Sequence, residues 1–275
     1  MQTKHIIIVA VVAAIILIGV MIGVGIRSPM VGGSVGVIEI TGVIHSPKHI
    51  LKDLKIFGED PSIKAIILRI NSPGGVVAAS QEIYDMVKRQ GDKKPIISSM
   101  ESVAASGAYY LALPSDVIVA NPGTITGSIG VIMEWPVLEK LLQKIGIEFE
   151  TVKSKEHKDI GSSYRRMNDK ERQLMQGVVT DVYDQFVAVT AEHRMIPVDS
   201  VARYADGRVF TGGQAKALGF IDTLGSFETA VEIAGDMVGI ERPHLIYPPK
   251  RVSLVDLFVE PVEHLLLPKL YFLWR

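Results

Sequence analysis

The chain has 275 residues, 48% of them hydrophobic, and its 29 lysines and arginines nearly balance its 30 aspartates and glutamates. It is long enough to bury one substantial core and lacks the basic excess that suits nucleic-acid binding. The absence of cysteine excludes disulfides, thiol catalysis and cysteine-ligated metals, and it is compatible with any redox compartment.

The first segment in chain order is an uncharged run at residues 6–26, IIIVAVVAAIILIGVMIGVGI. A helix of this length can cross the roughly 30 Å hydrocarbon layer of a membrane. A cleaved signal peptide would have a shorter apolar stretch, about 7 to 15 residues, and then a small-residue cleavage site. We therefore predict a retained anchor at residues 1–27, in the cell membrane. The flanking charges are Lys4 before the run and Arg27 after it, and we predict that residues 28–275 lie outside the cytoplasm.

After a connector at residues 28–34, strand-like and helix-like segments alternate through residues 35–251, which predicts one α/β domain. The strand-like segments are rich in β-branched residues and too continuously apolar to be half-exposed. We expect strands over residues 35–43, 63–70, 95–100, 116–120 and 147–153. We expect helices over residues 50–57, 77–89, 106–113, 136–144 and 169–193.

The last of these helices has the clearest start. Asn168 and Glu171 have the spacing of a capping pair. An apolar stripe at helical spacing follows, and we expect it to belong to the core. Its members are Leu174, Val178, Val182 and Phe186.

Ser106, in the sequence AASGA, is the first candidate for chemistry. It lies between a strand-like and a helix-like segment, among neighbours too small to block it. Such a turn leaves the hydroxyl open to a substrate carbonyl and can aim a backbone N–H at the carbonyl oxygen. The alternative is a helix packed tightly in the core, with Ser106 only as its cap. Because no Lys, Arg or His occurs between Lys94 and Lys140, a base for Ser106 has to come from elsewhere in the chain.

The sequence NSPGG, at residues 71–75, directly follows an apolar strand. Its glycines permit backbone conformations that aim N–H groups into the crevice where such sheets bind ligands. It could supply half of an oxyanion hole, and the alternative is an ordinary tight turn.

Most of the seven histidines have no carboxylate partner suggested by spacing, which leaves the cluster His157, Lys158 and Asp159 as the source of a base. A lysine can deprotonate a serine only in its neutral form, and a charge-free surrounding such as that of Ser106 favours this form. Ser128 could hold the amine by a hydrogen bond without restoring its charge. His157 is the rival base.

Four motifs, NSPGG, SVAASGAYYLA, TGSIGV and KDIGSSYRRM, occur in this order, and together they resemble the signal peptide peptidase A family. These are membrane-bound serine peptidases related to the Clp protease and crotonase folds, and the resemblance spans about residues 33–240. It implies a Clp protease/crotonase-like domain of repeated ββα units, here joined to an N-terminal transmembrane helix. It implies no metal ion and no cofactor.

Carried over by position, the resemblance makes Ser106 the nucleophile, Lys158 the general base and Ser128 the residue that orients the lysine. The oxyanion donors would then be the backbone N–H of Gly107 and one from the turn at Gly74 and Gly75. Short family members share each active site between subunits of a ring-shaped oligomer, and this chain has the short form. One departure is Ala108, which stands where many relatives have a second glycine, and we expect it to affect substrate fit more than chemistry.

The resemblance implies a membrane-anchored serine endopeptidase that degrades cleaved signal peptides and similar extended segments through an acyl-enzyme. The alternatives are a non-catalytic oligomeric scaffold of the same fold, a stomatin-cleaving-type membrane protease and, more distantly, a crotonase-type acyl-CoA enzyme. Residues 252–275 are apolar but interrupted by Pro261 and Pro268, too often for a second span. We expect them either to contact another subunit or the membrane surface, or to fold onto their own domain.

Overall fold

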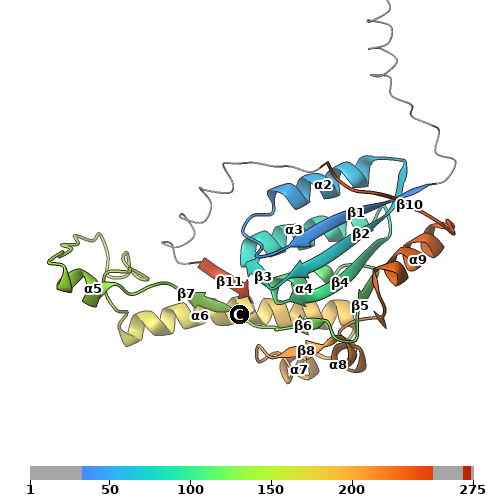
Figure 1. Cartoon of the computed structure of the whole chain (residues 1–275). Helices are drawn as coiled ribbons and strands as arrows, with labels where there is room; N and C mark the ends of the chain where they lie inside the picture. The colour runs from blue at the N-terminus through green and yellow to red at the C-terminus, as the bar shows by residue number, and fades with distance from the viewer. Residues whose placement is uncertain (1–32, 250–268, 274–275) are drawn as a thin grey trace, which may run out of the picture. The chain divides into compact units, whose positions relative to one another are not determined.

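The structure is a computed structural model that describes residues 33–249 and 269–273. The predicted anchor at residues 6–26 lies outside them. Within the described ranges, no helix is long and apolar enough to cross a membrane. The described chain is built around an eight-stranded sheet, mostly parallel, with helices packed on both faces (Figure 1). The α/β prediction is confirmed.

The main sheet has the strand order β10-β1-β2-β4-β5-β9, with β6 paired to the far end of β4 and β8 antiparallel to β6. These strands are β1 (Ser34–Thr41), β2 (Ile63–Ser72), β4 (Ile96–Ala105), β5 (Val117–Ala120), β6 (Ile125–Gly127), β8 (Val209–Thr211), β9 (Thr223–Leu224) and β10 (His244–Ile246). A second, antiparallel sheet has the order β3-β11-β7, from β3 (Gly74–Val76), β11 (Lys269–Leu273) and β7 (Ile132–Glu134).

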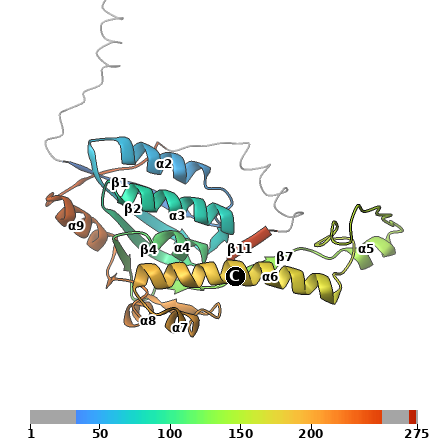
Figure 2. The same cartoon turned by 180° about the vertical axis from the view of Figure 1, so that it is seen from behind.

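The alternation of side chains along β2 explains the layers. Ile66, Leu68 and Ile70 point into a large apolar cluster shared with several helices, whereas Ala65 and Ile67 face a smaller cluster under α9 (Phe227–Val238). A strand buried on both faces has to be apolar throughout, which is why the sequence shows no polar alternation here. The helices of the large cluster include α2 (Lys48–Glu59), α3 (Val77–Gly91), α4 (Gly107–Ala112) and α6 (Asp169–Arg194). Figure 2 shows α6 crossing this face beside α4.

A long arm leaves the sheet after β7 and returns at the start of α6 (Figures 1 and 2). It carries one short helix, α5 (Glu139–Lys144), and much of its apolar surface is exposed. The strand expected over residues 147–153 is absent, so that prediction is wrong. Ile147 and Phe149 are 44% and 50% exposed, because no sheet edge lies along the arm to pair with this segment.

Helix α6 begins where the sequence predicts. The Asn168 side chain accepts a hydrogen bond from the Glu171 N–H, and the Glu171 side chain accepts one from the Asn168 N–H, which completes the capping box. The expected core stripe is only half correct. Val182 and Phe186 are buried, but Leu174 and Val178 are 48% and 43% exposed, because the first half of α6 lies beside the arm rather than on the sheet (Figure 1).

The remaining described helices, α7 (Val198–Ala202) and α8 (Gly212–Ala217), follow α6. Of residues 252–275, the structure describes only 269–273, and these form β11 on their own domain.

Candidate active site

Ser106 lies at the junction between β4 and α4, as the sequence predicts. Its backbone has φ 55° and ψ −119°, a conformation that L-residues rarely adopt and that costs about 1–3 kcal/mol. Its N–H donates to the carbonyl of Gly127 at 2.7 Å, and the Tyr110 N–H donates to its carbonyl, so both neighbouring elements hold the turn. The side chain is 1% exposed, and its Oγ has no hydrogen-bond partner among the described residues. Such a hydroxyl is costly unless a ligand or another chain completes it.

Ser128 lies next to Ser106 because the strands that precede them are paired. In the parallel register, Ala105 of β4 is opposite Gly127 of β6. Ser106 and Ser128 are the next residues of the two strands, so they come at the same edge of the sheet. Ser128 also has a positive φ, 51°, and its N–H donates to the carbonyl of Arg208. The structure thus brings together two of the residues that the sequence selects.

Three glycines converge at the same edge. Gly74 has φ +99°, and a Cβ added to it would lie 2.7 Å from the Gly107 nitrogen. A Cβ added to Gly107 would lie 2.5 Å from the Oγ of Ser80 and 3.2 Å from the Gly75 nitrogen. No side chain fits at either position, so the backbone amides can approach each other and any group placed between them. The glycines of NSPGG therefore lie against Gly107, the residue after Ser106.

Lys158 is not part of this cluster. It lies in a series of turns on the arm, and it is exposed. It does not hydrogen-bond to the Oγ of Ser106, which has no partner among the described residues. Figure 1 shows the arm, with α5 at its tip, reaching away from α4. His157 lies on the same turns, where its Nε2 is 3.6 Å from a carboxylate oxygen of Glu156. Neither candidate base therefore contacts the serine within one copy of the chain.

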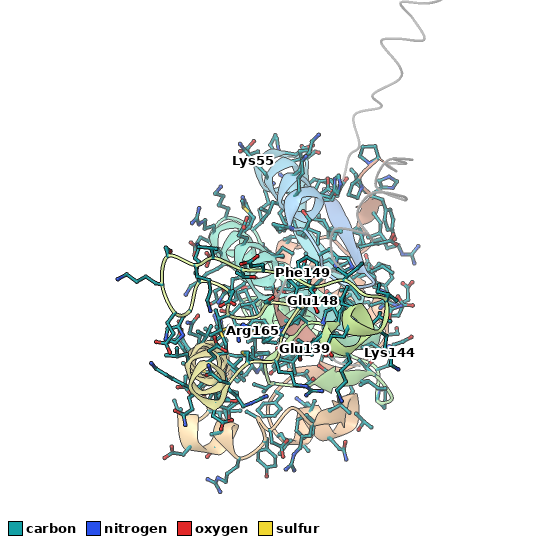
Figure 3. The ribbon with its side chains drawn as sticks, turned by 90° about the vertical axis from the view of Figure 1, so that its left-hand side faces the viewer. Lys55, Glu139, Lys144, Glu148, Phe149 and Arg165 are labelled. Atoms are coloured by element: carbon teal, nitrogen blue, oxygen red, sulfur yellow. The ribbon has the colours of Figure 1, made fainter. Side chains whose placement is uncertain are left out.

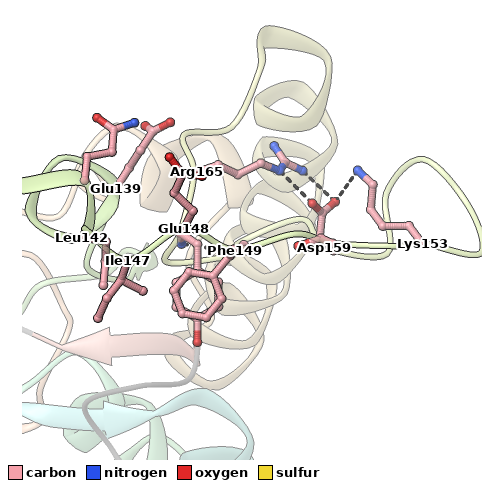
Figure 4. Close-up of a pocket in the computed structure, with 12 residues that line it drawn as sticks. Glu139, Leu142, Ile147, Glu148, Phe149, Lys153, Asp159 and Arg165 are labelled. Atoms are coloured by element: carbon pink, nitrogen blue, oxygen red, sulfur yellow. Dashed lines mark hydrogen bonds and ion pairs between the residues drawn. The ribbon is translucent and has the colours of Figure 1, made fainter. Parts of the chain in front are cut away.

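A charged network holds the turns that carry Lys158. Arg165 donates to both carboxylate oxygens of Asp159, at 2.8 and 2.7 Å, and to both of Glu171, at 2.8 and 2.6 Å. Lys153 adds a further bond to Asp159, at 2.8 Å (Figure 4). Hydrogen bonds from Arg165 lower the pKa of Asp159, and they lower that of Glu171 to about 2. Because Glu171 also belongs to the capping box of α6, as the partner of Asn168, the network fixes the turns that carry Lys158 to the start of this helix.

This network also lines a cavity of about 470 Å³ in the arm. Figure 3 shows labelled residues of its wall, including Glu139, Glu148, Phe149 and Arg165, gathered at the end of the molecule formed by the arm. Phe149 stacks on Tyr164 with ring centroids 3.8 Å apart, which closes one side. Sequence reasoning identified Lys158 but not Arg165. The sequence signal for Arg165 is that it lies six residues after Asp159 and six before Glu171.

The sequence predicts an open hydroxyl at Ser106, whereas the structure buries it. Strand β11, which sequence reasoning did not identify, lies beside the residue after the serine: a Cβ added to Gly107 would lie 3.2 Å from the Cβ of Phe272. A second cavity, of about 570 Å³, borders Ser128 and Leu273. The site therefore has β11 next to its glycines and open space beside Ser128.

The comparisons with known proteins agree with the motifs. The model of peptidase family S49 matches residues 88–241, more than half of the chain, and that of Clp protease matches residues 37–117. The Synechocystis protein named "Putative protease slr0021" is 43% identical over 206 residues, which cover 74% of each chain. The Arabidopsis thaliana protein "Serine protease SPPA, chloroplastic" is 35% identical, over 82% of this chain and 33% of its own. The Enterococcus faecium protein "Putative signal peptide peptidase SppA" is 37% identical, over 68% of this chain and 55% of its own.

The chain thus spans three quarters of one relative and about half or less of the others. The resemblance drawn from the four motifs is confirmed by the family model and by relatives that carry protease names. The chain belongs to peptidase family S49, a family of proteases.

Proposed function

We propose that the protein is a serine endopeptidase in which Ser106 is the nucleophile and Lys158 of a neighbouring copy is the general base. The observation that supports this most strongly is the Oγ of Ser106, buried and unpartnered at a strained strand-to-helix turn beside converging amides. A hydroxyl without a partner is free to react with a substrate carbonyl, and the amides beside it can stabilise the oxyanion that forms.

In the proposed reaction, Ser106 Oγ attacks the carbonyl carbon of the scissile peptide bond while its proton passes to the neutral Nζ of Lys158. The resulting oxyanion accepts hydrogen bonds from the N–H groups of Gly107 and Gly75. Gly75 is favoured over Gly74 because the Gly74 N–H already donates to the Oγ of Ser72 at 3.1 Å. Nζ then protonates the leaving amine, and water hydrolyses the acyl-enzyme by the same path in reverse.

Ser128 is proposed to orient the lysine. It lies one strand away from Ser106 at the same sheet edge, and it lines the cavity through which a side chain from another copy can enter. His157 is the rival base. If it is the true base, His157→Ala will abolish turnover and Lys158→Ala will spare it, and the assignment of Lys158 is then wrong.

The proposed substrates are cleaved signal peptides and similar extended segments, and the proposed place is the cell membrane. The name of the Enterococcus relative and the apolar run at residues 6–26 support this. An anchor raises the effective concentration of the catalytic domain near membrane-bound peptides. The catalytic domain is proposed to lie outside the cytoplasm, in a ring-shaped homo-oligomer.

A fluorophosphonate probe tests the nucleophile directly. The full chain, purified in detergent as an oligomer, is expected to be labelled once per chain, and Ser106→Ala should abolish labelling. Ser115→Ala is the matched control, because Ser115 is also buried but its Oγ is bonded to that of Ser98 at 2.7 Å. Labelling that persists in Ser106→Ala would overturn the assignment. An intact oligomer that is never labelled and cleaves no peptide would indicate the non-catalytic scaffold instead.

A further inference from the structure

The loop at residues 205–208 holds the turn that carries Ser128. The Ser128 N–H donates to the carbonyl of Arg208 at 2.9 Å, and the Gly207 N–H donates to the carbonyl of Ile129 at 3.1 Å. Strand β8 follows the loop directly and pairs with β6, the strand that ends just before Ser128. Hydrogen bonds on both sides therefore fix the loop in place beside Ser128.

Asp206 and Arg208 form a charge pair within this loop. Nε of Arg208 donates to Oδ1 of Asp206 at 2.7 Å, and Nη2 donates to Oδ2. The Arg208 N–H also donates to Oδ1, at 3.1 Å, and together these bonds lower the pKa of Asp206 to about 2. The two side chains are about half exposed, and an exposed pair of this kind adds little to stability. The pair therefore matters less for folding than for the charge that it presents to its surroundings.

Asp206 faces the cavity of about 570 Å³ that also borders Ser128. The charged residues of the cavity wall are Asp206, from the loop, and Asp184, from α6. Tyr183 of α6 lines it as well, and burial raises the pKa of its hydroxyl, so it adds no charge. Within the part of the chain that the structure describes, Asp184 forms no ion pair. Arg208 thus cancels one of the two negative charges of the wall.

The turns that carry Lys158 have their carboxylates paired in the same way. Asp159 is paired with Arg165 at 2.7 Å, and Glu156 with Lys170 at 3.1 Å. The other titratable residues of these turns are Lys155 and His157. An unpaired carboxylate near a lysine favours the charged amine, whereas a carboxylate that already has a cation favours it much less. Pairing on its own chain therefore leaves Lys158 freer to lose its proton.

We propose that the Asp206–Arg208 pair forms the receiving side for Lys158 of a neighbouring copy and keeps that lysine neutral, because Arg208 cancels the charge of Asp206 where the amine enters. This rests on the proposed function, in which Lys158 acts as a base only without its proton. Both residues act through the lysine and not on the substrate. When another copy covers the cavity, water leaves it, and the remaining charges act more strongly on the amine.

Within one chain, this pair and the arm lie at different ends of α6. Figures 1 and 2 show α7 and α8 beside the second half of α6, and the arm at its first half. The loop at residues 205–208 connects α7 to β8 and belongs to the former end. An effect of Arg208 on Lys158 is therefore expected only between copies.

Two substitutions should move the pKa of Lys158 in opposite directions. Arg208→Met leaves Asp206 unpaired and is expected to raise this pKa by about half a pH unit or more. Asp206→Asn leaves Arg208 as an unpaired cation and is expected to lower it by a similar amount. Asparagine keeps the oxygen that accepts the Arg208 N–H, so the loop is retained. A merely structural role of the pair would not give shifts of opposite sign.

Conservative and control variants complete the set. Arg208→Lys keeps the charge and should restore most of the wild-type value, and the double variant Asp206→Asn, Arg208→Met should lie close to wild type. Arg203→Met is the matched control. Arg203 is also an exposed arginine of this region, but it donates to the carbonyl of Asp199 and does not line the cavity. It should leave the pKa of Lys158 unchanged.

The measurement needs no catalysis, so it uses full-length, detergent-solubilised oligomers in the Ser106→Ala background. Trace acetic anhydride modifies only neutral amines, and mass spectrometry at a series of pH values reports the modified fraction of Lys158, with the exposed Lys140 of α5 as reference. Below the pKa, half a pH unit changes the neutral fraction by about threefold. No shift in Arg208→Met and Asp206→Asn, or shifts of the same sign, would overturn the inference.

The fluorophosphonate probe on wild-type oligomers separates this outcome from the proposed function. If Lys158 responds as expected but Ser106 is never labelled, the receiving cavity stands and the nucleophile assignment fails. If Ser106 is labelled but Lys158 ignores both substitutions, the nucleophile stands and the role of the Asp206–Arg208 pair is refuted.

Discussion

At the residue scale, the site depends on two serines whose φ angles, 55° at Ser106 and 51° at Ser128, are unfavourable for any residue with a Cβ. Each costs about 1–3 kcal/mol and persists only because the surrounding hydrogen bonds determine it. The small neighbours of Ser106 made the turn predictable from sequence. The pairing of Ala105 with Gly127, which puts Ser128 beside it, was not, because strand register depends on contacts far apart in the chain.

Arg165 provides the sharpest test at this scale. Its two bidentate pairs fix the turns of Lys158, so Arg165→Ala is expected to lower kcat by about 10- to 100-fold through misplacement of the base, with KM changed little. Arg165→Lys should recover little of this, because a lysine cannot bridge two carboxylates in the same fork geometry.

The matched control is Arg166→Ala, one residue along the chain and exposed. Steady-state hydrolysis of a quenched peptide by the intact oligomers gives both parameters. Equal losses for the Arg165 and Arg166 variants would remove the positioning role of Arg165.

At the element scale, predictions succeeded where burial set the pattern. The continuous apolar runs gave β1, β2, β4 and β5, and amphipathic periodicity with a capping pair gave α6. They failed on the arm, where Ile147, Phe149 and Val152 form a strand-like run that lies exposed in the single chain. The short strands β3, β7 and β11 carry no periodicity of their own, because three to five residues are too few to show it.

The contact between α3 and α6 should make stability depend on pH. His193 of α6 lies 2.6 Å from the hydroxyl of Tyr84 on α3, and burial lowers the pKa of its imidazole from 6.5, while Glu192 opposes and Lys88 and Arg194 reinforce this shift. The unfolded chain then binds a proton that the folded chain resists. Stability is complete above about pH 6.5 and falls as the pH drops below it.

We expect the melting temperature of the oligomer to fall between pH 7 and pH 5.5, and to fall less in His193→Gln. His244→Gln is the control, because His244 is an exposed histidine on β10. Thermal unfolding followed by circular dichroism at the two pH values measures both slopes. Parallel slopes for wild type and His193→Gln would show that His193 does not contribute.

At the scale of the whole molecule, the nucleophile and its proposed base lie on different parts of the fold. Ser106 is at the sheet edge, Lys158 is on the arm, and the arm and the first half of α6 expose apolar side chains that a solitary domain has no reason to present. These include Leu141, Ile145, Val152, Leu174 and Val178. The resemblance had suggested a site shared between subunits, and the separation within one copy of the chain supports that proposal.

The central claim is that one copy supplies the serine and another the lysine. Its most direct test is co-expression of Ser106→Ala and Lys158→Ala chains with different affinity tags, followed by tandem purification of mixed oligomers and a peptidase assay. Each variant alone should be inactive. In randomly mixed rings about a quarter of the interfaces pair an intact serine with an intact lysine, so about a quarter of wild-type activity is expected to return. Mixed oligomers with no activity above either variant would contradict the shared site and favour a dyad formed within one chain.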